Sequence, residues 1–300
     1  MSETITIDAP RRPVLRWHGG KWKLGPWIIG HFPPHRVYVE PFGGAASILL
    51  RKPRCYAEVY NDLDQDAVCL FRILRDPVKS AALVEQLRLT PFAKMEFEES
   101  YIPAGSDIEQ ARRLLIRSFM GFGSNGHNAA TKTGFRANSN RSGTTPARDW
   151  ANYPDLLPTI IERLTGVVIE CRDACEVMSA HDGPETLHYV DPPYVRETRS
   201  RAMHRDGCYA HEMDAASHER LLGHLTTLDG MVVLSGYHHP TYDAALATWR
   251  RVEIAALADG ARDRTEVLWI NPQAAAALDA TKEQHEMFAE ASPVTAGERT

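Results

Sequence analysis

The run RVYVEPFGGAAS, Arg36–Ser47, begins with alternating β-branched and aromatic residues, turns through two glycines and continues into small apolar residues. Alternation of this kind favours a buried strand. A glycine turn straight after a first strand lets a ligand approach the backbone and offers it the N–H groups of the helix that follows. The run therefore predicts a strand–turn–helix unit of an α/β fold, with a ligand site at the turn.

Six further runs rich in apolar or β-branched residues carry the same strand signal. They occupy residues 56–62, 166–173, 187–194, 230–237, 250–257 and 265–271. Strands that alternate with helix-like stretches indicate an α/β fold with a mainly parallel sheet. The linker between the last two runs is too short for a crossover helix, so we expect them to pair antiparallel at one side of the sheet.

The strand rhythm stops between Asp76 and Arg163, where helical patterns at 78–89 and 108–120 precede a long stretch rich in Gly, Asn, Ser and Thr. Loops of that length are usually functional or disordered. We therefore expect a second, mostly helical domain inserted into the first. The predicted bounds are 14–77 and 164–271 for the main domain, 78–163 for the insert and 272–300 for a frayed or disordered tail.

The composition is that of a globular protein, with 43% hydrophobic and 24% charged residues and a net charge of −5. No apolar run is long enough to cross a membrane, and the first residues lack the apolar segment of a signal peptide. The five cysteines form no CxxC pair, which favours reduced thiols. We expect a cytoplasmic protein.

The glycine turn lacks the patterns that hold phosphates. It is neither GxGxxG nor the GxxxxGK of ATP-binding loops, which disfavours a dinucleotide or ATP. Glu40, just before the turn, would repel a phosphate, and Asp62 follows Gly43 by 19 positions, near the roughly 20 expected of a ribose-binding acid. S-adenosylmethionine (SAM) has an amino group, a sulfonium and a ribose but no phosphate, so these charges favour SAM as the cofactor.

The segment YVDPPY, Tyr189–Tyr194, ends another apolar run with an acid, two prolines and an aromatic residue. Prolines lack an N–H donor but keep their carbonyl acceptors. Asp191 and the Pro192 carbonyl would give two acceptors for the two hydrogens of an amine, and Tyr194 a flat face for a base. The segment indicates an exocyclic amine on a planar ring as the substrate.

In order along the chain, RWHGGKWKL (Arg16–Leu24), VEPFGGAAS (Val39–Ser47), NDLD (Asn61–Asp64) and VDPPY resemble the motifs of the Dam-like adenine-N6 DNA methyltransferases. That family has its cofactor turn first, a target-recognition region next and DPPY last. The resemblance covers nearly the whole chain apart from its termini. It implies a Rossmann-like SAM-dependent methyltransferase sheet with helices on both faces and an inserted, mostly helical target-recognition domain. Ala46 departs from the family, which often has Gly there, and leaves the turn more crowded.

The resemblance also implies that Trp17, Lys21, Asp62 and Asp191 lie at the cofactor. Asp173, after a strand run, could contact the cofactor adenine or cap a helix. The predicted cofactor-binding residues are Trp17, Lys21, Glu40, Phe42, Gly43, Gly44, Asp62, Asp173 and Asp191. The predicted catalytic residues are Asp191, Pro192, Pro193 and Tyr194.

From Gln110 to Arg148 the chain carries seven bases and no acid, although its net charge is negative. Bases, together with Asn, Ser and Thr, suit contacts with DNA phosphates and base edges, and Phe122 and Phe135 suit wedging or stacking. Further arginines follow DPPY. The predicted DNA-binding residues are Arg117, Lys132, Arg136, Arg141, Arg148, Arg196 and Arg199.

These features predict a SAM-dependent methyltransferase that flips an adenine out of double-stranded DNA and methylates its N6 atom. The histidines after DPPY lack zinc-finger spacing, so we expect no metal. Three alternatives stay open: a cytosine-N4 enzyme, which usually has Ser in place of Asp191; a protein-glutamine or RNA methyltransferase; and a catalytically silent DNA-binding homologue. We expect a monomer, and leave open a cognate restriction endonuclease and a phage or prophage setting.

Overall fold

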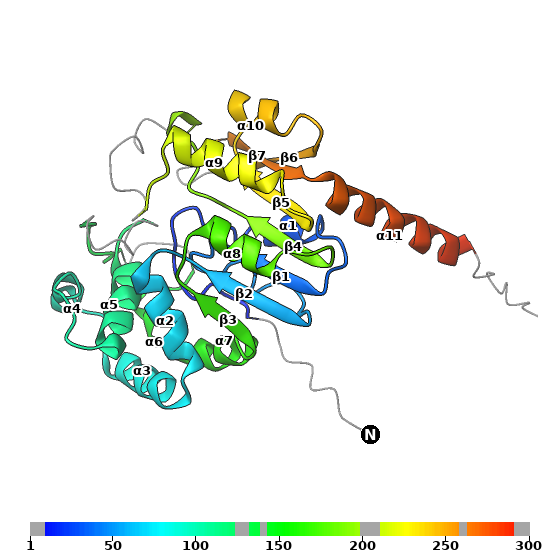
Figure 1. Cartoon of the computed structure of the whole chain (residues 1–300). Helices are drawn as coiled ribbons and strands as arrows, with labels where there is room; N and C mark the ends of the chain where they lie inside the picture. The colour runs from blue at the N-terminus through cyan, green and yellow to red at the C-terminus, as the bar shows by residue number, and fades with distance from the viewer. Residues whose placement is uncertain (1–9, 124–131, 139–142, 199–210, 258–262, 291–300) are drawn as a thin grey trace, which may run out of the picture.

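The computed structural model describes residues 10–123, 132–138, 143–198, 211–257 and 263–290. Within them, seven strands form one sheet in the order β3-β2-β1-β4-β5-β7-β6 (Figure 1). The strands are β1 Val37–Glu40, β2 Ala57–Asn61, β3 Val167–Glu170, β4 Thr186–Val190, β5 Met231–Gly236, β6 Arg250–Leu257 and β7 Asp263–Ile270. The first five strands in that order pair in parallel with their neighbours. Strand β7 runs antiparallel between β5 and β6. The predicted α/β sheet with an antiparallel pair at one side is confirmed.

The strand order reverses between β1 and β4, since β2 and β3 lie on one side of this pair and β5 on the other. Open α/β sheets bind ligands at the carboxyl ends of their strands at such a point. Val39 pairs with His188, so the end of β1 lies beside the segment that leads into the DPPY motif. The topology therefore brings the two motifs singled out in the sequence to one edge of the sheet.

Helices cover both faces of the sheet. They are α1 Gly25–Ile29, α2 Gln65–Arg75, α3 Pro77–Leu89, α4 Lys94–Glu99, α5 Asp107–Met120, α6 Pro146–Ala151, α7 Leu157–Arg163, α8 Ala174–His181, α9 Ala215–Leu225, α10 Pro240–Ala245 and α11 Pro272–Glu290, with short 3-10 turns η2 Pro154–Leu156 and η3 Arg196–Thr198. Side chains alternate along each strand, so Tyr38 and Tyr189 enter the core on one face while Val39 and Val190 enter the cores on the other.

The helices between residues 78 and 163 extend the core of the sheet. Leu83 of α3 and Leu115 of α5 are fully buried in the same cluster as Tyr60 of β2 and Phe71 of α2. Asp76 caps the start of α3 with its carboxylate, just before the proline that favours a first helical turn. This packing makes the helical region continuous with the sheet, and the domain bounds at 78 and 163 stay a prediction.

Residues 272–290 form the helix α11, where the sequence indicated a frayed or disordered tail (Figure 1). An alanine run has high helix propensity, Asn271 accepts the Ala274 N–H at 3.0 Å, and Ala274 is buried. Arg250 of β6 pairs with Asp279 farther along the helix. No helix among the described residues is long and apolar enough to cross a lipid bilayer.

Candidate active site

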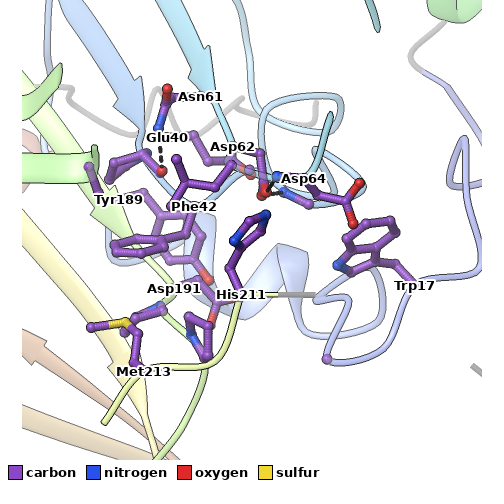
Figure 2. A pocket seen from close by; sticks show the side chains of 18 of the residues that line it. Trp17, Glu40, Phe42, Asn61, Asp62, Asp64, Tyr189, Asp191, His211 and Met213 are labelled. Atoms are coloured by element: carbon purple, nitrogen blue, oxygen red, sulfur yellow. Dashed lines mark hydrogen bonds between the residues drawn. The ribbon is translucent and has the colours of Figure 1, made fainter. Parts of the chain in front are cut away.

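A cavity of about 300 Å³ lies at the carboxyl ends of β2, β1 and β4. Each of these strands brings an acid to it: Asp62 after β2, Glu40 at the end of β1 and Asp191 after β4. Figure 2 shows the three acids around one space, with Trp17 at one end and Met213 at the other. The volume is at the lower end of the range of roughly 300–1,000 Å³ found for small-molecule sites.

Two aromatic side chains fix the glycine turn and leave no room for a Cβ atom. A Cβ at Gly43 would lie 2.1 Å from the Tyr60 ring, and one at Gly44 would lie 2.7 Å from the indole nitrogen of Trp17. Gly44 also has φ +47°, in the left-handed region that favours glycine. The shape of the turn therefore requires both glycines and places Trp17 against them.

Ala46 adopts a left-handed conformation too, with φ +52°. This conformation costs an L residue roughly 1–2 kcal/mol. Residues 44–51 form successive turns rather than the helix that the sequence predicted, for instance with the Ala46 N–H bonded to the Gly43 carbonyl at 2.7 Å. The predicted helix does not form here, because the left-handed residues Gly44 and Ala46 interrupt the stretch where the helix would begin.

Asp62 holds the start of this irregular turn. Its carboxylate accepts the backbone N–H of Gly44 at 2.7 Å and that of Asp64 at 2.8 Å. Burial raises the pKa of Asp62 to about 6, and the two hydrogen bonds oppose that rise. A carboxylate has about four acceptor positions. Asp62 can therefore accept these two backbone N–H groups and still bind a hydroxyl or a cation of a ligand.

Glu40 holds the end of the same turn and is also buried. Its Oε2 atom accepts the Tyr38 hydroxyl at 2.7 Å and the Leu49 N–H at 2.9 Å. Burial raises the pKa of Glu40 to about 8, although both hydrogen bonds favour the ionised form. A bound cation would add a further favourable partner for this carboxylate.

Asp191 forms an ion pair with Lys21, whose Nζ lies 3.0 Å from Oδ1. Lys21 also donates to the Gly19 carbonyl at 2.9 Å, and its ammonium lies 4.6 Å from the centre of the Tyr194 ring. Burial raises the pKa of Asp191, and the charge of Lys21 opposes the rise. The N-terminal motif and the DPPY motif, far apart in sequence, therefore meet at one ion pair.

Tyr194 is buried, and its hydroxyl is held by the last strands of the sheet. It donates to Glu266 of β7 at 2.8 Å and lies 3.0 Å from the Ser235 hydroxyl of β5. The ring face that was expected to receive a base carries the Lys21 ammonium in this structure. A base that stacks there would have to displace the lysine. Pro192 and Pro193 line the cavity.

Asp173 lines the cavity and also caps a helix, so both sequence interpretations fit its position. Its Oδ1 accepts the Cys175 N–H at 2.9 Å at the start of α8. Its carboxylate pairs with Arg220 of α9 at 2.8 Å, and this hydrogen bond lowers the pKa of Asp173.

Several residues of the cavity wall carry no sequence signal. His211 and Met213 line it from the segment between DPPY and α9, and Arg220 lines it from α9 itself. Figure 2 shows His211 pointing into the space between Asp62 and Asp191. The sequence did not place His211 at the cofactor site, because nothing in the local pattern shows that the chain returns to the cavity.

Three of the bases in the acid-free stretch are paired with acids from elsewhere. Arg117 has a side chain 5% exposed and lies 2.6 Å from Asp66 of α2. Arg112 and Arg113 both pair with Glu109. The prediction that Arg117 contacts DNA does not fit this position, since a buried, paired guanidinium is not placed to contact a phosphate.

The remaining basic residues are placed differently. Lys132, Arg148 and Arg196 are exposed, and Arg136 is half-buried. The Arg196 guanidinium lies 4.0 Å from Glu212, a weak pairing. Arg141 and Arg199 lie outside the described residues. The exposed bases can therefore face DNA, and their role stays a prediction.

The two phenylalanines singled out in the insert differ in position. Phe122 is 71% exposed. Phe135 packs against Phe92 and Phe97, with ring centres 5.1 Å and 5.8 Å away. Only Phe122 is placed to insert into a partner. Among the residues that the model describes, no group of three or more His, Cys, Asp or Glu could hold a metal ion.

Comparison with known proteins identifies the family of the chain. Residues 17–228 match the model of the D12 class N6 adenine-specific DNA methyltransferases. The chain is 23% identical over 187 residues to a DNA adenine methylase of Escherichia coli (strain K12) and 24% identical over 187 residues to one of Salmonella typhi. Each match covers 61% of this chain and 65% of the relative, so the chain spans less than two thirds of these relatives. Because the family model matches well over half of it, the chain belongs to the D12 class N6 adenine-specific DNA methyltransferases.

Proposed function

We propose that the protein transfers a methyl group from SAM to N6 of an adenine in double-stranded DNA. The observation that carries this proposal is the position of Asp191, a mostly buried carboxylate that lines an acid-rich cavity and forms an ion pair with Lys21. A carboxylate oxygen accepts hydrogen bonds, and an adenine N6 amine offers two N–H donors. Family membership makes adenine the favoured base.

The charges of the cavity support SAM as the cofactor. Six acids line it, against two strong bases, Lys21 and Arg220, each of which is paired with one of those acids. This excess of negative charge suits a ligand with a sulfonium and an amino group, and disfavours a phosphate. Trp17 and Gly44 would hold the cofactor at one end, Asp62 its ribose and Glu40 its cationic part.

The residues of the chain would bind and orient the amine. When bound, SAM supplies an electrophilic methyl group. Asp191 and the Pro192 carbonyl would accept the two N6 hydrogens, which directs the nitrogen lone pair out of the base plane. Holding the reacting groups in place is a large part of such catalysis. The adenine must leave the duplex first, at a cost of a few kcal/mol, and exposed bases such as Lys132 and Arg148 would hold the backbone meanwhile.

The test is expression in a methylation-deficient bacterium, followed by single-molecule sequencing of its genomic DNA. We expect N6-methyladenine at one short motif. Asp191→Ala should lower the methylation rate by about hundredfold or more, because the amine loses a charged acceptor. N4-methylcytosine instead would identify the cytosine enzyme, and an unmethylated genome would contradict the proposal.

We further propose that the protein acts as a cytoplasmic monomer on duplex DNA. Light scattering of the purified protein, alone and with a duplex that carries the sequenced motif, measures the stoichiometry. A cognate endonuclease, where one exists, would cut the same motif, so the sequencing result also defines the assay for that partner.

A further inference from the structure

The turn that follows the cofactor glycines has no regular secondary structure, so its backbone–backbone bonds satisfy only some of its buried backbone groups and side chains satisfy others. Leu49 is fully buried in this turn. Its N–H donates to Glu40 at 2.9 Å, and its carbonyl accepts a hydrogen bond from the guanidinium of Arg163. One peptide segment is thus held from two sides, by an acid of the cavity and by an arginine at the end of α7.

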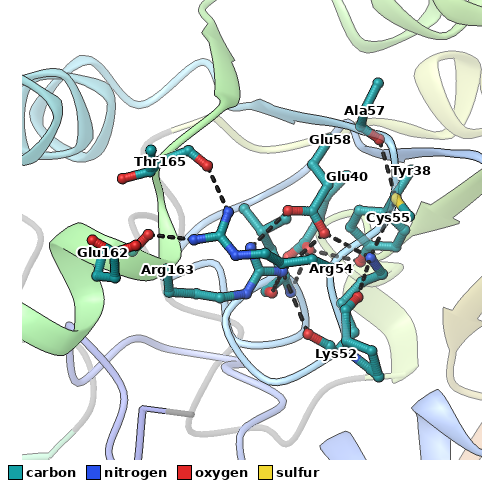
Figure 3. A network of polar contacts seen from close by, with 12 residues as sticks. Tyr38, Glu40, Lys52, Arg54, Cys55, Ala57, Glu58, Glu162, Arg163 and Thr165 are labelled. Carbon is teal, nitrogen blue, oxygen red and sulfur yellow. Dashed lines mark hydrogen bonds and ion pairs between the residues drawn. The ribbon is translucent and has the colours of Figure 1, made fainter. Parts of the chain in front are cut away.

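Arg163 belongs to a buried ion cluster with Glu58 and Lys52 (Figure 3). Arg163 Nη1 lies 2.6 Å from Glu58 Oε2, and Lys52 Nζ lies 2.7 Å from Glu58 Oε1. All three side chains are less than 10% exposed. Burial alone would raise the pKa of Glu58, but Arg163 and Lys52 lower it, so the carboxylate is ionised.

The cluster also reaches Glu40 by a second route. The Lys52 ammonium lies 4.5 Å from the centre of the Tyr38 ring, and the Tyr38 hydroxyl donates to Glu40 at 2.7 Å. The hydrogen-bond partners of Arg163 described above do not line the cavity, yet both routes from its cluster end at the same carboxylate, Glu40.

We infer that Arg163 is a positioning residue of the cofactor site: held by Glu58, it fixes the Leu49 carbonyl and thereby the segment that Glu40 and the cofactor glycines share. This inference rests on the proposed function, because the cofactor is SAM. Loss of the guanidinium would leave the Leu49 carbonyl without this donor and let the turn relax away from Glu40. The remaining Lys52–Glu58 pair stays neutral overall, so the fold should tolerate the change.

The chain offers a matched control in Arg54. This exposed arginine lies between the cofactor turn and β2, and its guanidinium bonds the Glu162 carbonyl and, at 2.6 Å, the Thr165 carbonyl. Its bonds go to the end of α7, whereas those of Arg163 go to the Leu49 carbonyl of the cofactor turn and to Glu58. Each variant removes one arginine contact near the end of α7, but only the Arg163 variant removes a donor to the turn.

The experiment is calorimetric titration of SAM into the full-length chain, without DNA, for wild type, Arg163→Met, Arg163→Lys and Arg54→Met. We expect Arg163→Met to weaken SAM binding about tenfold, which corresponds to one charged hydrogen bond. Arg163→Lys should fall between it and wild type, and Arg54→Met should bind like wild type. Duplex DNA affinity, measured by anisotropy, should be the same for all four.

Equal losses of SAM affinity in Arg163→Met and Arg54→Met would overturn the inference, as would wild-type affinity in a folded Arg163→Met. Circular dichroism and urea unfolding establish which variants are folded, and Arg163→Lys carries the comparison if Arg163→Met is not. A wild-type chain that binds no SAM would contradict the proposed function itself, which distinguishes the two failures.

Discussion

At the scale of the residue, the sequence located the acids of the site but not their partners. Glu40 ends a strand and Asp62 and Asp191 directly follow strands. The strand ends of a parallel sheet share one edge, so the meeting of these acids was predictable. The pairing of Lys21 with Asp191, and of Tyr194 with Glu266 72 residues later, depends on chain paths that no local pattern encodes.

Gly43 gives the clearest prediction at this scale. Gly43→Ala would place a Cβ inside the Tyr60 ring, so the turn must shift at a cost of about 1–3 kcal/mol for overpacking. We expect lower stability in urea unfolding together with loss of SAM binding in titration. Gly105→Ala is the control, because a Cβ there meets nothing within 4 Å. Undiminished SAM binding by Gly43→Ala would show that the turn does not contact the cofactor.

The buried acids predict how cofactor binding depends on pH. The pKa of Glu40 in the free protein is raised to about 8, so much of the carboxyl is protonated at pH values below 8. A bound cation would lower this pKa, so at those pH values SAM binding releases a proton from Glu40. SAM affinity should therefore rise as the pH increases from 6.5 to 8.5, by at most about tenfold per unit for one group.

Glu40→Gln keeps an acceptor for Tyr38 and Leu49 but cannot titrate, so it should flatten this dependence. The amino group of SAM also titrates in this range, and only the difference between wild type and Glu40→Gln isolates the protein's contribution. Parallel pH profiles for the two proteins would remove Glu40 from the cofactor site.

At the scale of the element, the strands and most helices form where their sequence patterns predicted them. The run of bases without acids, by contrast, did not predict which bases are exposed. All seven predicted strands are present, and α3 and α5 begin within one residue of the predicted helices. The acid-free stretch did not make α5 basic, because Asp66 of α2 packs beside it. The turn at 44–51 was predicted as a helix because the small apolar residues after the glycines are compatible with one. Nothing in the sequence indicates that Ala46 adopts a left-handed backbone conformation.

Two arginines of the helical region test whether a buried, paired base stabilises the fold while an exposed base binds DNA. Arg117→Met removes the ion-pair partner on one carboxylate oxygen of Asp66, while Gln110 still bonds the other. We therefore expect a loss of about 1–3 kcal/mol in the free energy of unfolding and little direct effect on DNA binding. Arg148→Met, at an exposed position of α6, should leave unfolding unchanged, weaken DNA binding and reduce the salt dependence of the affinity by about one unit of slope.

Urea unfolding and anisotropy titrations at several salt concentrations measure both variants. Weaker DNA binding by a stably folded Arg117→Met would restore that residue to the DNA-contacting set. An unchanged salt slope in Arg148→Met would remove α6 from it.

At the scale of the whole molecule, one core joins the sheet to the helices of residues 78–163. The N-terminal segment strengthens this union, because the Tyr153 hydroxyl donates to the Val14 carbonyl at 2.7 Å and Ser118 bonds the backbone of Arg16. The sequence predicted an inserted domain because the strand patterns stop between Asp76 and Arg163. A change from strand to helical patterns does not show whether two regions share a core.

A shared core predicts a single cooperative unfolding transition. Circular dichroism and tryptophan fluorescence should report the same midpoint in urea, since Trp150 of α6 and Trp269 of β7 both lie in packed interiors. Two separated transitions would show instead that residues 78–163 fold as an independent domain.

The hydrogen bond from Tyr194 to Glu266 also bears on how the molecule is made. The ribosome adds residues from the N-terminus, so a chain that has just completed DPPY carries every recognisable motif while β5 and β7 are still unsynthesised. Its tyrosine hydroxyl then lacks both Ser235 and Glu266. Messenger truncation after the motifs would thus yield a polypeptide with the signature of the family and an unfinished pocket, and the enzyme matures only when its last strand leaves the exit tunnel.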